Sequence, residues 1–243
     1  MDVRTRTHVI TDRQTGGQQL VIDGFHLSAA EHVAALVARW RYPPGRFERY
    51  LPRWNGITGW LPPSQGARLF DLARGTDAAG DVVEIGSAFG RSTVCLALGT
   101  RMRGAGRVYA VDPHTGGIGL VEEYGALAAA FSSLRAFMQN IARFKLDDVV
   151  VPLTVTSQAA AASWPGTPIR LLFIDGWHDY DACRHDILRW GRWVTPGGVI
   201  AIHDYDWPEV KRAVDDSVQE LGGFGPVETP DPNLALARRE AAP

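Results

Sequence analysis

The stretch "FIDGWHDY", residues 173–180, decides the fold, because an apolar run ends there abruptly in a carboxylate. The same turn holds Asp175, Trp177 and His178. A tight turn after a buried strand needs Gly176, since glycine adopts backbone angles that other residues avoid, but it needs none of the other polar groups. The stretch therefore indicates a buried strand whose carboxyl end carries chemistry.

Strand and helix patterns alternate from about residue 66, which is typical of a parallel sheet covered by helices on both faces. Continuous apolar runs predict buried strands at 81–86, 107–112, 149–155, 169–175 and 197–204. The tail, residues 225–239, contains a Pro-Asp-Pro turn and predicts two more short strands. Apolar residues at helical spacing predict the intervening helices, one of them over 125–143. We therefore expect an α/β fold with a mostly parallel sheet.

Residues 1–65 have a different texture. They predict one possible strand at 19–23 and a helix at about 29–41, followed by 42–64, which is rich in proline, glycine and aromatic residues and has no clear period. Long irregular segments of this kind are usually functional or form interfaces. We expect residues 1–65 to be an N-terminal cap or lid and interface segment, and residues 66–243 to form the main α/β domain.

The composition limits the partners. A formal net charge of −2 provides no basic field for nucleic acid or anionic lipid. No apolar segment approaches the roughly 20 residues that span a bilayer, and the first residues lack the apolar core of a secretory signal. These features predict a cytoplasmic protein with no nucleic-acid or membrane partner. The size of the aromatic-rich cap favours a homo-oligomer.

In open parallel sheets, ligands bind at the carboxyl ends of the strands, and each predicted strand here is followed by polar groups. These groups are Glu84 with the loop 86–93, Asp112, Ser157 with Gln158, Asp175 with His178, and His203 with Asp204 and Tyr205. The glycine turn that leads into a helix allows close approach of a ligand and favours negative charge, although it departs from the dinucleotide pattern G-x-G-x-x-G. Asp112 lies where a carboxylate can accept both hydroxyls of a ribose.

Five segments together resemble the class I S-adenosylmethionine-dependent methyltransferases. They are "VVEIGSAFGRST", "VYAVD", "TSQ", "LLFIDGWHDY" and "PGGVIAIHDY". The similarity is to the small-molecule branch with its catechol-type and macrocin-type (sugar and antibiotic) O-methyltransferases, and it covers about residues 58–229. The resemblance implies a Rossmann-like, seven-stranded, mostly parallel sheet whose last strand is inserted antiparallel. It also implies that residues 66–243 bind S-adenosyl-L-methionine and transfer its methyl group to a hydroxyl of a small polar molecule, a sugar or a natural-product intermediate.

The resemblance assigns roles to the polar groups. The implied cofactor residues are Glu84, Gly86, Ser87, Gly90, Ser92, Asp112, Ser157, Gln158 and Asp175. Among them, loop 86–90 would contact the methionine part with Glu84 near its amino group, Asp112 would hold the ribose, and the "SQ" pair would meet the adenine. The implied ligands of a divalent metal, Mg²⁺ or Mn²⁺, are Asp175, His203 and Asp204. The imidazole departs from the family's usual carboxylates and makes Mg²⁺ less suitable than Mn²⁺, Fe²⁺ or Zn²⁺.

His178 occupies the position of the catalytic lysine in catechol-type enzymes, and we expect it to act with Asp175 in catalysis. A neutral imidazole, with its usual pKa of about 6.5, can take a proton from the acceptor at neutral pH. The alternative is that His178 caps the following helix or binds the backbone. Residues after the strand ends that could line the acceptor pocket are His114, Tyr124, Trp177 and Tyr205.

Three other functions stay open at this point. One is metal-free N-methylation of a small-molecule amine. A second is a nicotinamide-dependent dehydrogenase, which the broken glycine pattern and the His-Asp pair disfavour. A third is a non-catalytic cofactor-binding protein, against which the retained Asp175, His178 and Asp204 argue. No motif in the cap or in residues 113–126 identifies the acceptor.

Overall fold

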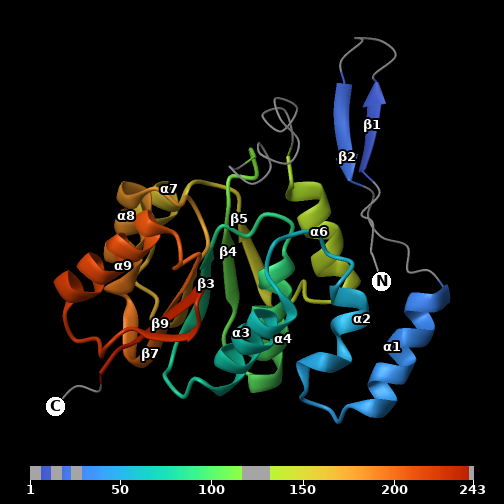
Figure 1. The fold of residues 1–243 in the computed structure, drawn as a ribbon, viewed down its shortest axis with the longest axis horizontal. Helices are drawn as coiled ribbons and strands as arrows, with labels where there is room; N and C mark the ends of the chain where they lie inside the picture. The colour runs from blue at the N-terminus through green and yellow to red at the C-terminus, as the bar shows by residue number, and fades with distance from the viewer. Residues whose placement is uncertain (1–6, 12–17, 23–28, 117–131, 241–243) are drawn as a thin grey trace.

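The computed structural model describes residues 7–11, 18–22, 29–116 and 132–240 (Figure 1). Tyr124 and the first part of the helix predicted at 125–143 lie outside these residues. No helix in the described ranges is long and apolar enough to cross a membrane.

The centre of the fold is a seven-stranded sheet with the order β5-β4-β3-β6-β7-β9-β8. Its strands are β3 (Asp81–Ile85), β4 (Val108–Val111), β5 (Val150–Leu153), β6 (Ile169–Ile174), β7 (Val194–His203), β8 (Glu228–Asp231) and β9 (Leu234–Arg238). Strands β3 to β7 are parallel, and β9 lies antiparallel between β7 and β8. This arrangement confirms the predicted Rossmann-like fold with an inserted antiparallel last strand.

Helices cover both faces of the sheet, as Figure 1 shows. One layer contains α3 (Pro63–Gly75), α4 (Arg91–Arg103) and α6 (Leu134–Arg143), and the other contains α7 (Ser157–Ala162), α8 (Tyr180–Gly191) and α9 (Pro208–Leu221). Successive strand residues face opposite sides, so Val82 and Phe173 pack under the first layer and Val83 and Leu172 under the second. Apolar side chains on both faces explain why the strands read as continuous apolar runs.

Strand register brings the polar strand ends to one rim. Ile85 pairs with Val111 on one side and with Ile174 on the other, and Ile174 pairs with Ile202. The residues that follow these four therefore emerge at the same edge of the sheet. Strand β7 begins earlier than the predicted 197, because Val194 already pairs with Ile169 of β6.

The N-terminal region contributes a separate two-stranded sheet of β1 (Thr7–Thr11) and β2 (Gln18–Ile22), then α1 (Ala29–Arg41), a 3₁₀ turn (Phe47–Arg49) and α2 (Leu51–Trp54). Trp54, Ile57 and Leu61 are buried in the same core as α3 and α4. Helix α3 runs across the cap boundary that the sequence suggested at residue 65, and that boundary stays a prediction.

Candidate active site

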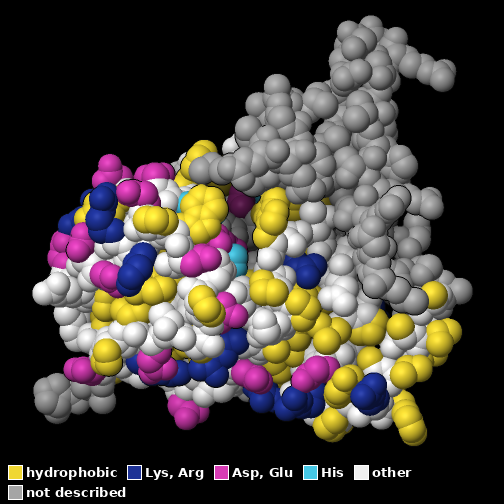
Figure 2. Space-filling view, viewed as in Figure 1, with side chains coloured by type: hydrophobic (Ala, Val, Ile, Leu, Met, Phe, Trp, Pro, Cys, Tyr) yellow, Lys and Arg dark blue, Asp and Glu magenta, His cyan; other side chains and the backbone are white. Residues whose placement is uncertain are grey.

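A cavity of about 410 Å³ opens at the carboxyl ends of the parallel strands, where the strand order reverses between β3 and β6 and where open α/β sheets bind their ligands. Figure 2 shows this face hollowed between two groups of hydrophobic side chains, with histidine and acidic side chains inside the hollow. The predicted site residues that line the cavity are Gly86, Ser87, Ser92, Asp112, Ser157, Gln158, Asp175, Trp177, His178, His203 and Asp204.

The loop after β3 lies close against its neighbours. Gly86 has a φ of 86°, and a Cβ atom at this position would overlap the carbonyl oxygen of Asp175. The backbone N–H of Ala88 donates to Asp112 Oδ2 at 2.8 Å, and the N–H of His114 donates to Asp112 Oδ1 at 2.6 Å. The two bonds fix the orientation of the Asp112 carboxylate, and each of its oxygens keeps a lone pair for a ligand.

Glu84 is fully buried beneath this loop and accepts a hydrogen bond from the Thr93 hydroxyl. Burial raises the pKa of Glu84 to about 8, so the side chain is mostly neutral at pH 7. Its Oε1 is one of the buried polar atoms that have no hydrogen-bond partner among the described residues, and the hydroxyl of Ser87 is another. Such unsatisfied atoms beside a cavity are suited to a polar ligand.

Ser157 is held by two side chains of α8. Its hydroxyl donates to Asp186 Oδ1 and accepts from Trp190 Nε1 at 3.0 Å. Asp186 itself lines the cavity and is buried, and burial raises the pKa of this carboxyl to about 6. Asp186 was not identified from the sequence, where it reads as one polar position in an amphipathic helix. It therefore joins Gln158 as a polar group of this part of the wall.

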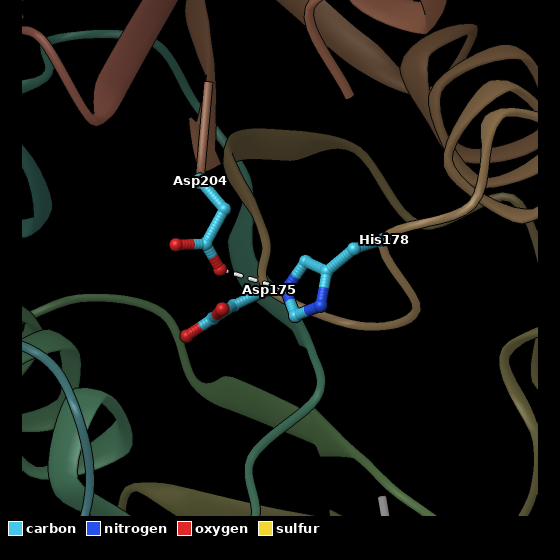
Figure 3. A group of neighbouring side chains, drawn as sticks. All are labelled: Asp175, His178 and Asp204. Carbon is cyan, nitrogen blue, oxygen red and sulfur yellow. Dashed lines mark ion pairs between the residues drawn. The ribbon is translucent and has the colours of Figure 1, made fainter. Parts of the chain in front are cut away.

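Asp175, His178 and Asp204 come from the ends of β6 and β7 and face one another (Figure 3). One ligand atom from each lies within 4.8 Å of the other two, and His178 Nε2 is 2.7 Å from Asp204 Oδ2. His203 contacts both carboxylates: its Nδ1 is 3.1 Å from Asp175 Oδ1 and 3.0 Å from Asp204 Oδ2. Two carboxylates and two imidazoles thus share one end of the cavity.

Pairing dominates the electrostatics of this cluster. Burial acts to lower the pKa of both histidines, but the neighbouring carboxylates outweigh it, raising the pKa of His178 and bringing that of His203 to about 10. Burial would raise the pKa of Asp204, yet its contacts with His178 and His203 hold that pKa well below its usual range. Without a bound cation, the cluster therefore carries its own positive charge on His203.

A family model described as "Methyltransferase domain" matches residues 83–205, the span from β3 through the Asp175, His178 and Asp204 cluster. The chain belongs to this methyltransferase family. The family match and the fold together confirm the predicted S-adenosylmethionine-dependent methyltransferase of class I.

Solved structures of O-methyltransferases share the fold of this methyltransferase. TomG from Streptomyces achromogenes, involved in tomaymycin synthesis and solved with S-adenosylmethionine, is 18% identical with a TM-score of 0.55, covering 89% of this chain and 92% of its own. An O-methyltransferase from Bacillus cereus, solved with S-adenosylhomocysteine, is 17% identical with a TM-score of 0.56 (88% and 92% covered). The calicheamicin methyltransferase CalS11 is 19% identical with a TM-score of 0.56 (88% and 94% covered).

Gln65 of α3 contacts His203 of the candidate site, and the sequence did not indicate this contact. Its Oε1 lies 2.9 Å from His203 Nε2, while its amide nitrogen donates to Asp231 Oδ1 at 2.9 Å and to Asn233 Oδ1 at 3.3 Å. Because Asp231 and Asn233 fix the orientation of the amide, Oε1 can only accept, and His203 Nε2 must carry the hydrogen. The other ring nitrogen, Nδ1, faces the carboxylates of Asp175 and Asp204.

Four predicted site residues do not line the cavity: Glu84, Gly90, His114 and Tyr205. Gly90 precedes α4. His114 is buried with its Nδ1 2.8 Å from the Ser133 hydroxyl, and the hydroxyl of Tyr205 donates to Asp215. Their ligand-binding roles stay predictions.

The capping alternative for His178 is not what the structure contains. Asp179 is the N-cap of α8, and its Oδ1 accepts from the N–H of Ala182 at 2.9 Å. The ring of His178 instead faces Asp204 and packs against Trp207, with ring centroids 4.8 Å apart. Its neighbours thus orient His178, which lines the cavity.

Proposed function

We propose that this methyltransferase transfers the methyl group of S-adenosylmethionine to a hydroxyl of a small-molecule acceptor, a sugar or other natural-product intermediate, with a divalent metal at the Asp175 and Asp204 carboxylates. The observation that carries the proposal is the Asp175, His178 and Asp204 cluster, which lies in the same cavity as the fixed carboxylate of Asp112. Donor and acceptor would therefore meet in one enclosure, and proximity accelerates a bimolecular transfer strongly.

The cofactor would occupy the half of the cavity formed by the loops after β3 and β4 and by the start of α7. Asp112 would accept the ribose hydroxyls, and the unpaired groups of Glu84 and Ser87 would meet the methionine part. Gln158 and Asp186 would offer polar atoms to the adenine. When bound, the sulfonium would supply an activated methyl group, which passes to the acceptor oxygen as the bond between methyl and sulfur breaks and the thioether leaves.

The cluster fits a divalent cation on its donor chemistry. Asp175 and Asp204 offer carboxylate oxygens, and Nδ1 of His203 is buried without a hydrogen bond of good geometry in the described structure. A mixed oxygen and nitrogen donor set suits Mn²⁺, Fe²⁺ or Zn²⁺ better than Mg²⁺. Such an ion would lower the pKa of an acceptor hydroxyl and orient it.

The remaining chemistry is assigned to the chain's own side chains. His178 would accept the hydroxyl proton, because its ring reaches the cavity and is held by Asp204 and Trp207. Asp204 would stabilise the imidazolium that forms, as a carboxylate does beside a catalytic histidine. Support for an oxygen acceptor comes from fold neighbours described as O-methyltransferases, one of them as a TDP-rhamnose 3'-O-methyltransferase of calicheamicin biosynthesis.

Isothermal titration tests the proposal. S-adenosylmethionine is titrated into chelator-treated protein and again in the presence of Mn²⁺ or Mg²⁺, with NAD as the control ligand and with Asp112→Ala and Asp204→Asn as the test variants. We expect saturable binding of S-adenosylmethionine that Asp112→Ala weakens at least tenfold, and a separate metal heat that Asp204→Asn abolishes. Cofactor binding with no metal heat would favour the metal-free N-methyltransferase. Binding of NAD alone would overturn the proposal.

A further inference from the structure

We propose that Asn233, at the tip of the hairpin formed by β8 and β9, is a positioning residue of the active site: its side-chain amide holds the Asp204 carboxylate so that one oxygen faces His178. The inference rests on the proposed function and deepens it, because it makes the turn of the antiparallel hairpin part of the site. The Pro-Asp-Pro sequence directly before Asn233 indicated only a turn between two strands.

Strand pairing places Asn233 beside Asp204. Strands β7 and β9 are antiparallel, and His203 pairs with Leu234. The residue after His203 and the residue before Leu234 therefore lie next to each other at the end of the pair. Asn233 thus reaches the carboxyl end of β7, although 29 positions separate it from Asp204 in the chain.

The side-chain amide of Asn233 makes three hydrogen bonds. Its Nδ2 donates to Asp204 Oδ1 at 3.0 Å and to Asp206 Oδ1 at 2.6 Å. Its Oδ1 accepts from Gln65 Nε2 at 3.3 Å. The two carboxylates can only accept a hydrogen bond and the Gln65 nitrogen can only donate one, so a single orientation of the Asn233 amide satisfies all three contacts.

The backbone of Asn233 is held as well. Its N–H donates to Asp231 Oδ1 at 3.0 Å, and its carbonyl oxygen accepts from the N–H of Tyr205 at 3.3 Å. Tyr205 follows Asp204, whose φ of 54° is uncommon for a residue other than glycine. Strained backbone of this kind persists where its surroundings restrain it. Asn233 supplies such a restraint, because it binds both the side chain of Asp204 and the next N–H along the chain.

These contacts decide which oxygen of Asp204 faces the cluster. Asn233 binds Oδ1, while Oδ2 lies 2.7 Å from His178 Nε2 and 3.0 Å from His203 Nδ1. Figure 3 shows the two oxygens pointing in different directions, one of them toward His178. The last side-chain torsion of an aspartate is only broadly restrained, so a bond to the far oxygen is what keeps this orientation. Without the Asn233 amide, Asp204 would lose its fixed direction toward the proposed base and toward a cation.

Two measurements that need no acceptor test the inference: titration of chelator-treated protein with Mn²⁺, and the nitrogen-resolved NMR signal of His178 Nε2 in metal-free protein. We expect Asn233→Ala to weaken Mn²⁺ binding about 10- to 100-fold, the usual effect of removing a group that orients a metal-binding residue. The His178 signal should shift in the same variant. Affinity for S-adenosylhomocysteine should not change, because Asn233 does not line the cavity.

Two control variants separate orientation from charge and from the conformation of the turn. Pro232→Ala changes an exposed residue of the same turn and should alter neither readout. Asp206→Ala removes a carboxylate and leaves the bond between Asn233 and Asp204, whereas Asn233→Ala removes no charge. We expect Asn233→Ala to weaken Mn²⁺ binding more than Asp206→Ala does. The reverse order would show that charge alone is responsible and would overturn the inference.

Binding of S-adenosylhomocysteine, measured first on every protein, separates this inference from the proposed function. Should wild-type protein fail to bind it, the proposed function would be wrong, and the inference with it. If wild type binds it but binds no Mn²⁺, the metal of the proposed function is wrong, and the His178 signal alone decides the role of Asn233. If Asn233→Ala does not fold, Asn233→Ser, a residue that suits turns and has a shorter side chain, takes its place. Unchanged Mn²⁺ affinity and an unchanged His178 signal in a folded variant would overturn the inference and leave the methyltransferase in place.

Discussion

At the scale of single residues, His178 is the side chain on which the proposed chemistry depends most. Replacement by Ala should lower turnover about 10²- to 10⁴-fold, the usual contribution of a general base, with cofactor affinity unchanged. Wild-type turnover should rise with pH above 6.5, because pairing with Asp204 raises the pKa of His178 and the base must be unprotonated. The variant should lack this rise. Steady-state kinetics over pH 5.5–9 measure both effects, with His185→Ala as the control; near-normal turnover with an unchanged pH profile would contradict the assignment.

Gln65 is a positioning residue whose role is visible at Nε2 of His203, because Gln65 Oε1 accepts the hydrogen of that nitrogen. In Gln65→Leu, the hydrogen on Nε2 of His203 loses its acceptor, and leaving a buried polar group unpaired costs about 1–3 kcal/mol. We expect that loss in urea unfolding and a changed Nε2–H signal in nitrogen-resolved NMR. Gln65→Glu, which keeps an acceptor, should retain the signal. Gln219→Leu, on an exposed position of α9, is the matched control. An unchanged His203 spectrum in Gln65→Leu would refute the role.

At the scale of elements, the closeness of β3 and β6 at their carboxyl ends predicts a sharp contrast between two glycines. In Gly86→Ala the added methyl group would overlap the Asp175 carbonyl, which should destabilise the protein by more than about 3 kcal/mol. The same change at Gly75, where nothing lies within 4 Å of the new methyl group, should stay within about 1 kcal/mol of wild type. Chemical denaturation of both variants decides the point, and similar stabilities would show that the loop can shift.

Strand ends could be predicted from the sequence, while contacts between distant elements could not. Asp112, Asp175 and Asp204 follow continuous apolar runs, so their place on one rim follows from the parallel sheet alone. Asp204 also has a φ of 54°, as Ala88 and His114 have positive φ angles; such strained backbone gathers at functional sites, but the sequence gives no sign of it. Gln65 meets its partner 138 residues away, and helical periodicity marks it only as a residue of a helix.

The same limit applies to the wall of the cavity. Residues 57–61 show no regular hydrophobic spacing, so the sequence predicts only that they belong to a cap. Their position follows from hydrogen bonds that the Arg91 guanidinium donates to the carbonyl oxygens of Leu61 and Ile57. Arg91 reads in the sequence as an ordinary first residue of a helix. Local pattern therefore specifies the elements of this protein, and long-range hydrogen bonds of buried polar groups specify how the site is closed.

At the scale of the whole molecule, two buried groups make stability depend on pH in the same direction. Glu84 has its pKa raised by burial to about 8 from 4.5, so the folded state holds a proton that the unfolded state releases between these values. Burial acts to lower the pKa of His203, but the neighbouring carboxylates raise it to about 10 from 6.5. Its folded state therefore also holds a proton that the unfolded state releases, between pH 6.5 and pH 10. Since the folded state binds more protons, the free energy of unfolding of metal-free protein should fall from pH 5 to pH 9.

Glu84→Gln separates the two contributions, because an amide keeps the buried shape and cannot ionise. We expect the variant to lose the contribution of Glu84, which lies between pH 4.5 and pH 8, and to keep the decline from pH 6.5 upward that belongs to His203. Urea unfolding of metal-free protein at pH 5, 7 and 9 measures this. Binding of the cofactor's ammonium group beside Glu84 should favour its ionised form, so titrations at pH 7 in buffers of different ionisation enthalpy should show proton release by wild type and none by Glu84→Gln. Equal proton release from both proteins would place the amino group elsewhere in the cavity.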